Sequence, residues 1–177
     1  MPNHVRTLLT VEGSDSDIAA LISAVRAEES AFSLNAVIPM PKELQGVNTG
    51  GTTIDGEQVR RWLEVERDGE TVSVKIPPET LARWQSDYGA SDWYDWAVNH
   101  WGTKWDAYNA EPWEIDPRGG AAAIEFSSAW CEPKPVFEAL AERFPALAFY
   151  IECSGEVDAD YSYTLNQPPR RRQRTAP

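Results

Sequence analysis

The sequence predicts an α+β fold, in which two helices cover one face of an antiparallel sheet and a tryptophan-rich lobe is inserted into the chain. Three observations lead to this fold class. Outside the middle of the chain, strand and helix patterns follow one another as strand, helix, strand, strand, helix, strand, which is the split βαβ order of a ferredoxin-like sheet. An Asp-Gly pair between alternating apolar residues indicates a β-hairpin in the middle. Two segments with tryptophans at helical spacing follow that hairpin.

The first three elements are expected within the first 41 residues. Residues 5–11 are rich in β-forming side chains and predict a strand. Ser14, followed by Asp17, is typical of a helix N-terminus, and apolar residues at helical spacing extend that helix to about Glu29. Residues 32–41 form an apolar run that two prolines interrupt, so we expect a short strand and a turn there.

The inserted lobe is expected over residues 42–103. Residues 42–57 are rich in glycine and threonine and predict an irregular loop. A phosphate-binding loop is disfavoured there because the Walker spacing is missing. Residues 61–76 form the predicted hairpin, with Asp68-Gly69 at its turn. From that turn we predict that Val65 pairs with Val72 and that Leu63 pairs with Val74. These four residues should share one apolar face with Ile76.

Two helices should complete the lobe. Pro77-Pro78 opens the first, which ends at Gly89. Ser91 is expected to cap the second, with Asp92 and Asp95 in its first turn and Gly102 at its end. The tryptophans of these helices and of the segment that follows them are Trp84, Trp93, Trp96, Trp101 and Trp105.

The remaining elements return to the predicted sheet. A strand at residues 104–108 is expected first, followed by a loop over residues 111–120. The elements predicted after that loop are strands at residues 121–129, 147–153 and 161–165 and a helix at residues 133–144. We therefore expect one domain over residues 1–166, with an insertion at about 42–103, and a basic Pro/Arg-rich tail at 167–177.

Charge constrains the function more than motifs do. The chain has 16 basic and 28 acidic residues and a formal net charge of -12. Arg170, Arg171, Arg172 and Arg174 lie in the tail, so the rest of the chain holds 12 basic against 28 acidic residues, a balance of -16. Such a body repels phosphates and disfavours duplex nucleic acid, whereas it suits a basic partner. The sequence shows no signal peptide and no apolar run of membrane-spanning length, and its two cysteines, Cys131 and Cys153, fit a reducing cytoplasm.

Four short segments resemble the YubB ferredoxin-like domain family. They are Met1-Pro2-Asn3-His4-Val5, Val37-Ile38-Pro39-Met40-Pro41, Asn99-His100-Trp101-Gly102-Thr103-Lys104-Trp105 and Ser128-Ala129-Trp130-Cys131-Glu132-Pro133-Lys134-Pro135-Val136. The resemblance spans residues 1 to about 155. Relatives have Asn where His100 and Asp106 stand, and the hairpin and tail look like additions. The resemblance implies a plasmid- or phage-borne protein without an established activity, and it implies no iron–sulfur cluster.

The candidate catalytic groups are few. His100 with Asp92, Asp95 or Asp106 forms a conceivable acid/base group, although a helix-capping role explains the first two aspartates. His4 and His100 are the two histidines, and their spacing indicates no metal site. Neither cysteine is expected to be reactive, and we expect no metal and no cofactor. Whether the chain is an enzyme is left open, with a non-enzymatic role favoured.

The tryptophan cluster has two interpretations. In the first, Trp101 and Trp105 are buried where the lobe meets the sheet, and truncating Trp105 costs about 3–5 kcal/mol. In the second, these rings with Lys104 form a stacking platform for bases or a peptide. The candidate binding residues are Trp101, Lys104, Trp105, Asp92, Asp95 and His100, with tail contacts from Arg170, Arg171, Arg172 and Arg174.

Three functions remain after this reasoning. The first is a non-enzymatic acidic protein from a phage or plasmid that binds a basic host protein, for example as an inhibitor of a nucleic-acid-handling or defence protein. The second is a single-strand nucleic-acid binder that uses the tryptophans and the arginine tail. The third is an enzyme centred on His100 and the nearby aspartates. The sequence does not determine the oligomeric state or name the partner.

Overall fold

The computed structural model describes residues 3–155 and 160–167. The chain divides into two compact units, one made of Met1–Ile38 with Gly102–Pro177 and the other of Pro39–Trp101. Each contains strands and helices, so the protein is an α+β protein, and every strand pairing described is antiparallel. Within the described residues, no helix has both the length and the apolar composition needed to cross a bilayer.

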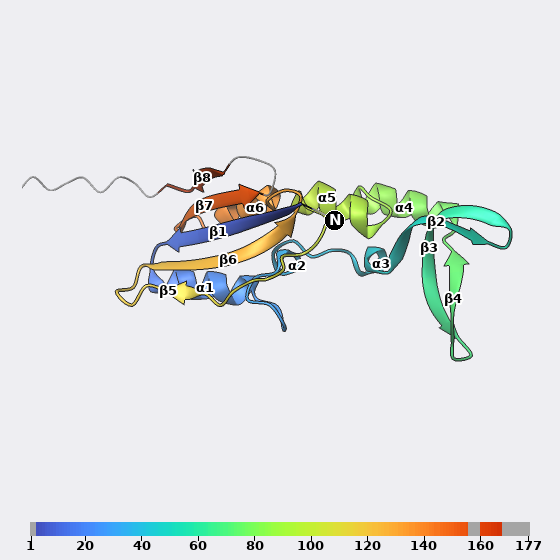
Figure 1. The fold of residues 1–177 in the computed structure, drawn as a ribbon, viewed down its shortest axis with the longest axis horizontal. Helices are drawn as coiled ribbons and strands as arrows, with labels where there is room; N and C mark the ends of the chain where they lie inside the picture. Colours follow the sequence, from blue (N-terminus) through green and yellow to red (C-terminus); the bar gives the residue numbers. More distant parts are fainter. Residues whose placement is uncertain (1–2, 156–159, 168–177) are drawn as a thin grey trace, which may run out of the picture. The chain divides into compact units, whose positions relative to one another are not determined.

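The first unit is built on a five-stranded sheet in the order β5-β6-β1-β7-β8 (Figure 1). The strand bounds are β1 His4–Glu12, β5 Glu114–Ile115, β6 Ala121–Ala129, β7 Ala148–Gly155 and β8 Tyr161–Leu165. Sequence patterns predicted four of these strands, with β8 at an edge. The two-residue β5 lies in a segment that was expected to be a loop throughout.

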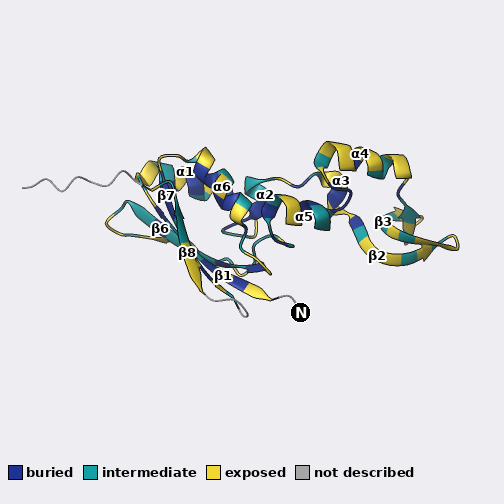
Figure 2. Ribbon diagram, turned by 90° about the horizontal axis from the view of Figure 1, so that it is seen from above, coloured by how far each residue is buried: buried dark blue, intermediate teal, exposed yellow. Residues whose placement is uncertain are grey.

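One face of this sheet is covered by helices (Figure 2). They are α1 (Asp15–Val25), α2 (Leu34–Val37) and α6 (Lys134–Arg143). Alternate residues of the central strands, such as Leu9, Phe126 and Ile151, are fully or almost fully buried on that face. The predicted N-cap of α1 is present, because the Ser14 side chain accepts the Asp17 backbone N–H. The core thus follows from the period-two pattern of the strands and the helical spacing of their cover.

Two predicted strands of this unit are absent. Residues 34–37 form α2 because polar groups satisfy its N-terminus: the Ser33 hydroxyl accepts the Ala36 N–H at 3.2 Å, and the Asp106 carboxylate accepts the Leu34 N–H. Residues 104–108 form no strand and contribute a single bridge, between Tyr108 and Ser127.

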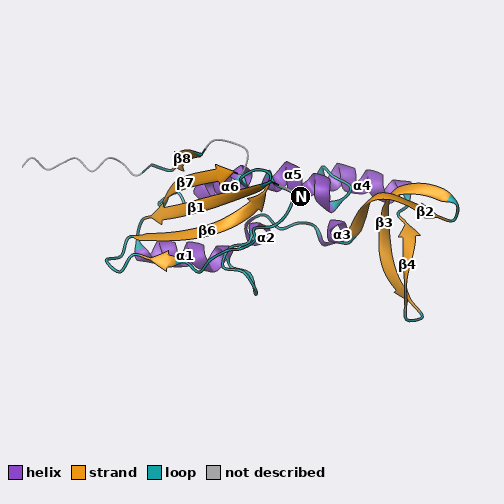
Figure 3. Ribbon diagram, viewed as in Figure 1, coloured by secondary structure: helices purple, strands orange, loops and turns teal. Residues whose placement is uncertain are grey.

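The second unit contains a three-stranded sheet, β2-β3-β4 (Figure 3). Its strands are β2 Val47–Ile54, β3 Glu57–Arg67 and β4 Glu70–Lys75. The predicted register is confirmed, since Val65 pairs with Val72 and Leu63 with Val74. These valines and Leu63 are half-buried and Ile76 is buried. The expected loop at 42–57 is wrong, because half of it forms β2, which pairs with β3 around an irregularity at Thr49/Thr52.

Three helices accompany this sheet: α3 Lys42–Gln45, α4 Pro78–Tyr88 and α5 Trp93–Trp101. Pro78 and Gly89 bound α4 as predicted. The predicted cap of α5 is off by one residue. Asp92, not Ser91, accepts the Asp95 backbone N–H, at 2.9 Å, because its carboxylate stands directly before the first helical residue.

Candidate binding site

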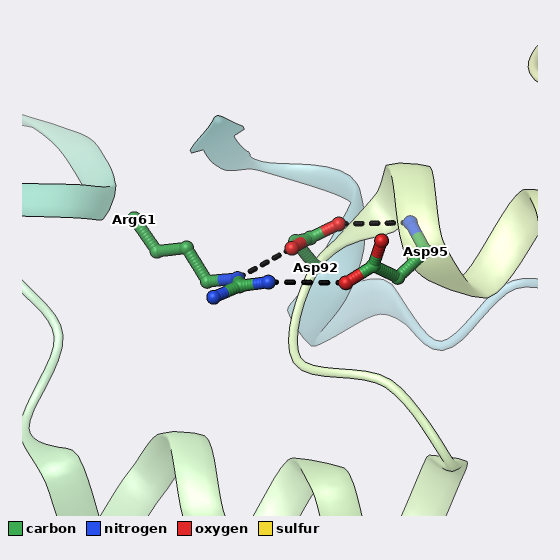
Figure 4. Close-up of polar contacts among 3 residues, drawn as sticks. All are labelled: Arg61, Asp92 and Asp95. Atoms are coloured by element: carbon green, nitrogen blue, oxygen red, sulfur yellow. Dashed lines mark hydrogen bonds and ion pairs between the residues drawn. The ribbon is translucent and has the colours of Figure 1, made fainter. Parts of the chain in front are cut away.

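Asp92 and Asp95, two of the candidate binding residues, are held by Arg61 of β3 (Figure 4). The Arg61 Nε donates to Asp92, and its Nη2 donates to Asp95 at 3.0 Å. The Asp92 side chain is 3% exposed and the Asp95 side chain 47%. The two carboxylates raise the pKa of Arg61, although partial burial of the guanidinium opposes them. This group therefore joins the hairpin sheet to the N-terminus of α5, and sequence patterns gave no sign of Arg61's part in it.

An open cavity of about 500 Å³ lies beside this ion-pair group. Gly50 and Gly51 line it together with Arg60 and Arg61. The charges of Arg60, Arg61, Asp92 and Asp95 balance, so the cavity favours neither an anion nor a cation. The geometry therefore indicates a structural tie rather than a ligand site.

His100 is engaged by its own helix. Its Nδ1 lies 2.9 Å from the Trp96 carbonyl oxygen, and its ring stacks on the Trp96 indole with centroids 4.3 Å apart. Asp92 and Asp95 are bound to Arg61, and Asp106 binds the Ser33 hydroxyl and the N-terminus of α2. The four groups of the proposed acid/base site thus each have another partner. Among the described residues, the contacts of these four groups include no hydrogen bond between His100 and an aspartate, so the proposed acid/base pair is not formed.

Trp101 and Trp105 differ in how far they are buried. Trp101 is 4% exposed and packs edge-to-face against Trp96, with centroids 5.4 Å apart. Trp105 is 38% exposed, so the expectation that both indoles are buried is wrong for Trp105. The reason is local: Gly102 ends α5 with a positive φ of 77°, and the segment after it forms no regular element.

Trp105 belongs to an exposed aromatic group. The Lys104 Nζ lies 4.5 Å from the Trp105 ring centroid and 5.2 Å from that of Trp130, which is 40% exposed. We call Lys104 and the two tryptophans that its ammonium contacts, Trp105 and Trp130, the aromatic clamp. Tyr108 meets Trp105 edge-on, and its hydroxyl lies 2.7 Å from the His4 Nδ1. Trp130 lies in one of the segments that resemble the family, but sequence patterns predict no binding role for it.

Trp130 also has an unusual backbone. Its φ is 73°, in the left-handed region, which costs a bulky L-residue about 1–2 kcal/mol. Its N–H donates to the Asn3 carbonyl at 2.8 Å, which ties the end of β6 to the start of β1. A glycine or asparagine would fit this backbone with less strain.

The sheet of the first unit has a second face, opposite its three helices (Figure 2). We call this side the open face. Its side chains come from the residues of β1 that alternate with the buried ones and from their partners: Arg6, Leu8, Thr10, Glu12, Ala123, Glu125, Ser127, Tyr150, Glu152, Ser154, Ser162 and Thr164, with Glu114 beside Ala123.

The open face is acidic. Leu8 is flanked in register by Glu125 and Glu152, and Glu12 accepts the Tyr150 hydroxyl at 3.2 Å. Among the strand positions of the open face, Arg6 is the one arginine or lysine, and it is bound to Glu125. Glu152 has no ion-pair partner within residues 3–155 and 160–167. A depression of about 430 Å³ lies over Arg6, Glu125 and Glu152.

The aromatic clamp adjoins the open face. Tyr108 bridges to Ser127, which pairs with Arg6, and the Tyr108 ring meets Trp105. His4, at the start of β1, contacts the same tyrosine. Tyr108 thus links the open face to the Trp105 ring.

The two cysteines differ in exposure. Cys131 is exposed, whereas Cys153 is buried and burial raises the pKa of its thiol. Within the described part of the chain, no three His, Cys, Asp or Glu side chains form a group able to hold a metal ion. Arg170, Arg171, Arg172 and Arg174 lie outside the described residues.

Comparisons with protein-family models, with curated proteins and with solved structures find no match to this chain.

Proposed function

We propose that this chain is a non-enzymatic binding protein whose open face docks a basic protein. One observation carries the proposal: this face presents Glu12, Glu114, Glu125 and Glu152, and its one arginine is already bound to a glutamate. A sheet face of this charge attracts arginine and lysine side chains and repels phosphates. The overall balance of 12 basic to 28 acidic residues outside the tail arginines acts in the same direction at longer range.

The test uses a defined cationic probe, a fluorescent peptide of alternating arginine and glycine, and a matched peptide in which neutral citrulline replaces arginine. We expect salt-dependent binding of the arginine peptide only. Glu152→Gln should weaken it about threefold, because one unpaired carboxylate is lost. The matched control is Glu142→Gln, an exposed residue of α6 outside the open face, which should change binding much less. Equal affinity of the two peptides, or equal effects of the two variants, would contradict the proposal.

A ferredoxin-like assignment is part of this proposal. The order β5-β6-β1-β7, with antiparallel neighbours and α1 and α6 on one face, supports it. In this assignment β5 takes the place of the second strand, and the Pro39–Trp101 unit is an insertion between α1 and β5. We further propose membership of the YubB-like proteins, a phage or plasmid origin and a cytoplasmic host partner, which the four resembling segments support.

A second candidate function is single-strand nucleic-acid binding, and the exposure of Trp105 and Trp130 around Lys104 favours it. The discriminating measurement is oligothymidine binding across a salt series, with the full chain and with a chain ending at Gln167. We expect no tight binding at physiological salt. Tight oligonucleotide binding that depends on the tail arginines would favour this second function over acidic docking.

A further inference from the structure

The aromatic clamp has the geometry of a cation-binding site that is occupied by the chain's own lysine. An ammonium or guanidinium within about 6 Å of an indole centroid is attracted by the ring's quadrupole. The Lys104 Nζ meets this condition for both Trp105 and Trp130, at 4.5 and 5.2 Å. Both tryptophan residues are more than a third exposed, which leaves them accessible to a cation from outside.

Lysine is a replaceable occupant. Its flexible stem allows the ammonium to move into water at little cost, and that ammonium is strongly hydrated. A guanidinium is planar, more weakly hydrated and stacks on aromatic faces, so it is the better ligand for two indoles. No salt bridge involving Lys104 is found in the described part of the chain, so no carboxylate there holds it in place.

We propose that the aromatic clamp is the specificity site of the open face: it takes an arginine side chain of the basic partner, which displaces the Lys104 ammonium from the Trp105 and Trp130 rings. This inference rests on the proposed function, because the open face supplies the charge that brings the basic segment to the clamp. The continuity through Tyr108 and Ser127 places the two surfaces along one path. The left-handed backbone of Trp130 is the cost of presenting the second indole.

Whether Lys104→Met strengthens or weakens binding distinguishes this inference from its alternatives. Lys104→Met keeps the apolar stem and removes the competing cation, so it should tighten binding of the arginine–glycine peptide, by about threefold. Trp105→Leu should weaken the same binding about fivefold because it removes one aromatic face. If the clamp instead served a nucleic acid, Lys104→Met would weaken binding of oligothymidine, because a phosphate contact would be lost.

Removing any positive charge near an acidic face also favours a cationic peptide, so a double-mutant cycle is needed. In the Trp105→Leu background, the gain from Lys104→Met should largely disappear, since the site that Lys104 vacates is no longer a clamp. Persistence of the full gain in that background would mean that Lys104 acts only through long-range charge, and would overturn the inference. Circular dichroism of each variant, and the indole N–H resonances of Trp105 and Trp130 in wild type with and without peptide, check folding and place the contact.

Failure of this inference and failure of the proposed function give different results. If the arginine peptide binds, Glu152→Gln weakens it and the cycle shows no coupling between Lys104 and Trp105, the open face docks the peptide but the clamp does not. If the arginine peptide does not bind in a salt-dependent manner, both proposals fail. Oligothymidine binding that Lys104→Met weakens would assign the clamp to nucleic acid.

Discussion

The Arg61 guanidinium donates to the almost fully buried carboxylate of Asp92, whose other oxygen accepts the backbone N–H of Asp95. Asp92 thus forms an ion pair with Arg61 and also caps the N-terminus of α5. Arg61→Met should destabilise the protein by about 3 kcal/mol, because it leaves a buried charge unpaired. Asp95→Asn should cost less than about 1 kcal/mol, since that carboxylate is 47% exposed. Urea unfolding followed by circular dichroism measures both, and equal losses for the two variants would contradict this assignment.

Trp101 and Trp105 should differ in what their removal costs. Trp101→Ala is expected to destabilise the protein by about 3–5 kcal/mol, as is usual for a buried aromatic residue. Trp105→Ala should cost only about 1–2 kcal/mol, because the 38% exposed ring already contacts water. Urea midpoints of the two variants provide the comparison. A loss for Trp105→Ala as large as that for Trp101→Ala would return Trp105 to the core and count against the clamp.

Local sequence patterns predicted part of the fold, whereas contacts between distant residues could not be predicted from them. A run of β-forming residues predicted β1, and the Asp68-Gly69 turn predicted the hairpin register, because each signal depends on neighbours in the chain or directly across a tight turn. The same reasoning failed at residues 34–37, where Asp106, 72 residues away from Leu34, caps a short helix. Local propensity contains no information about such a partner.

The candidate site was predicted only in part for the same reason. Asp92 and Asp95 were correctly expected at the start of a helix, but their pairing with Arg61 depends on a contact between separate elements. Lys104 and Trp105 were named from their spacing, whereas Trp130 joins them only through the fold. The open face emerges from the register of β1 with both neighbours, which sequence alone did not supply.

The turn between β3 and β4 leads to a prediction about stability. Asp68 and Gly69 have φ values of 52° and 82°, as a two-residue hairpin turn with positive φ at both positions requires. Gly69→Val should destabilise the protein by about 1–2 kcal/mol, because a β-branched residue resists this conformation. Gly51→Val in the neighbouring β2 is the control: both positions leave open space for a Cβ, but only Gly69 has a positive φ. Thermal unfolding should show a clear loss for Gly69→Val and a smaller change for Gly51→Val. Similar losses would exclude the turn conformation as the cause.

Tyr161 and Tyr163 of β8 predict a loss of stability at alkaline pH. Burial raises the pKa of both phenols well above the ordinary 10.0; the hydrogen bond that Tyr161 donates to Glu132 and the charge of Glu132 near Tyr163 raise them further. Below pH 10 the phenols are neutral in the folded and unfolded chain alike, so their contribution is fully present. Above pH 10 the unfolded chain releases these protons first, so the free energy of unfolding falls as pH rises toward the folded-state pKa values.

Two measurements check this linkage. Tyrosinate absorbance of the native protein should rise in a late step that Tyr163→Phe reduces. The urea midpoint should fall with pH above 10 in the wild type and fall less steeply in Tyr163→Phe, because one of the linked groups is gone. If all tyrosines of the native chain titrated together near pH 10, β8 would not shield these phenols from water, and the packing of this edge strand over α6 would have to be revised.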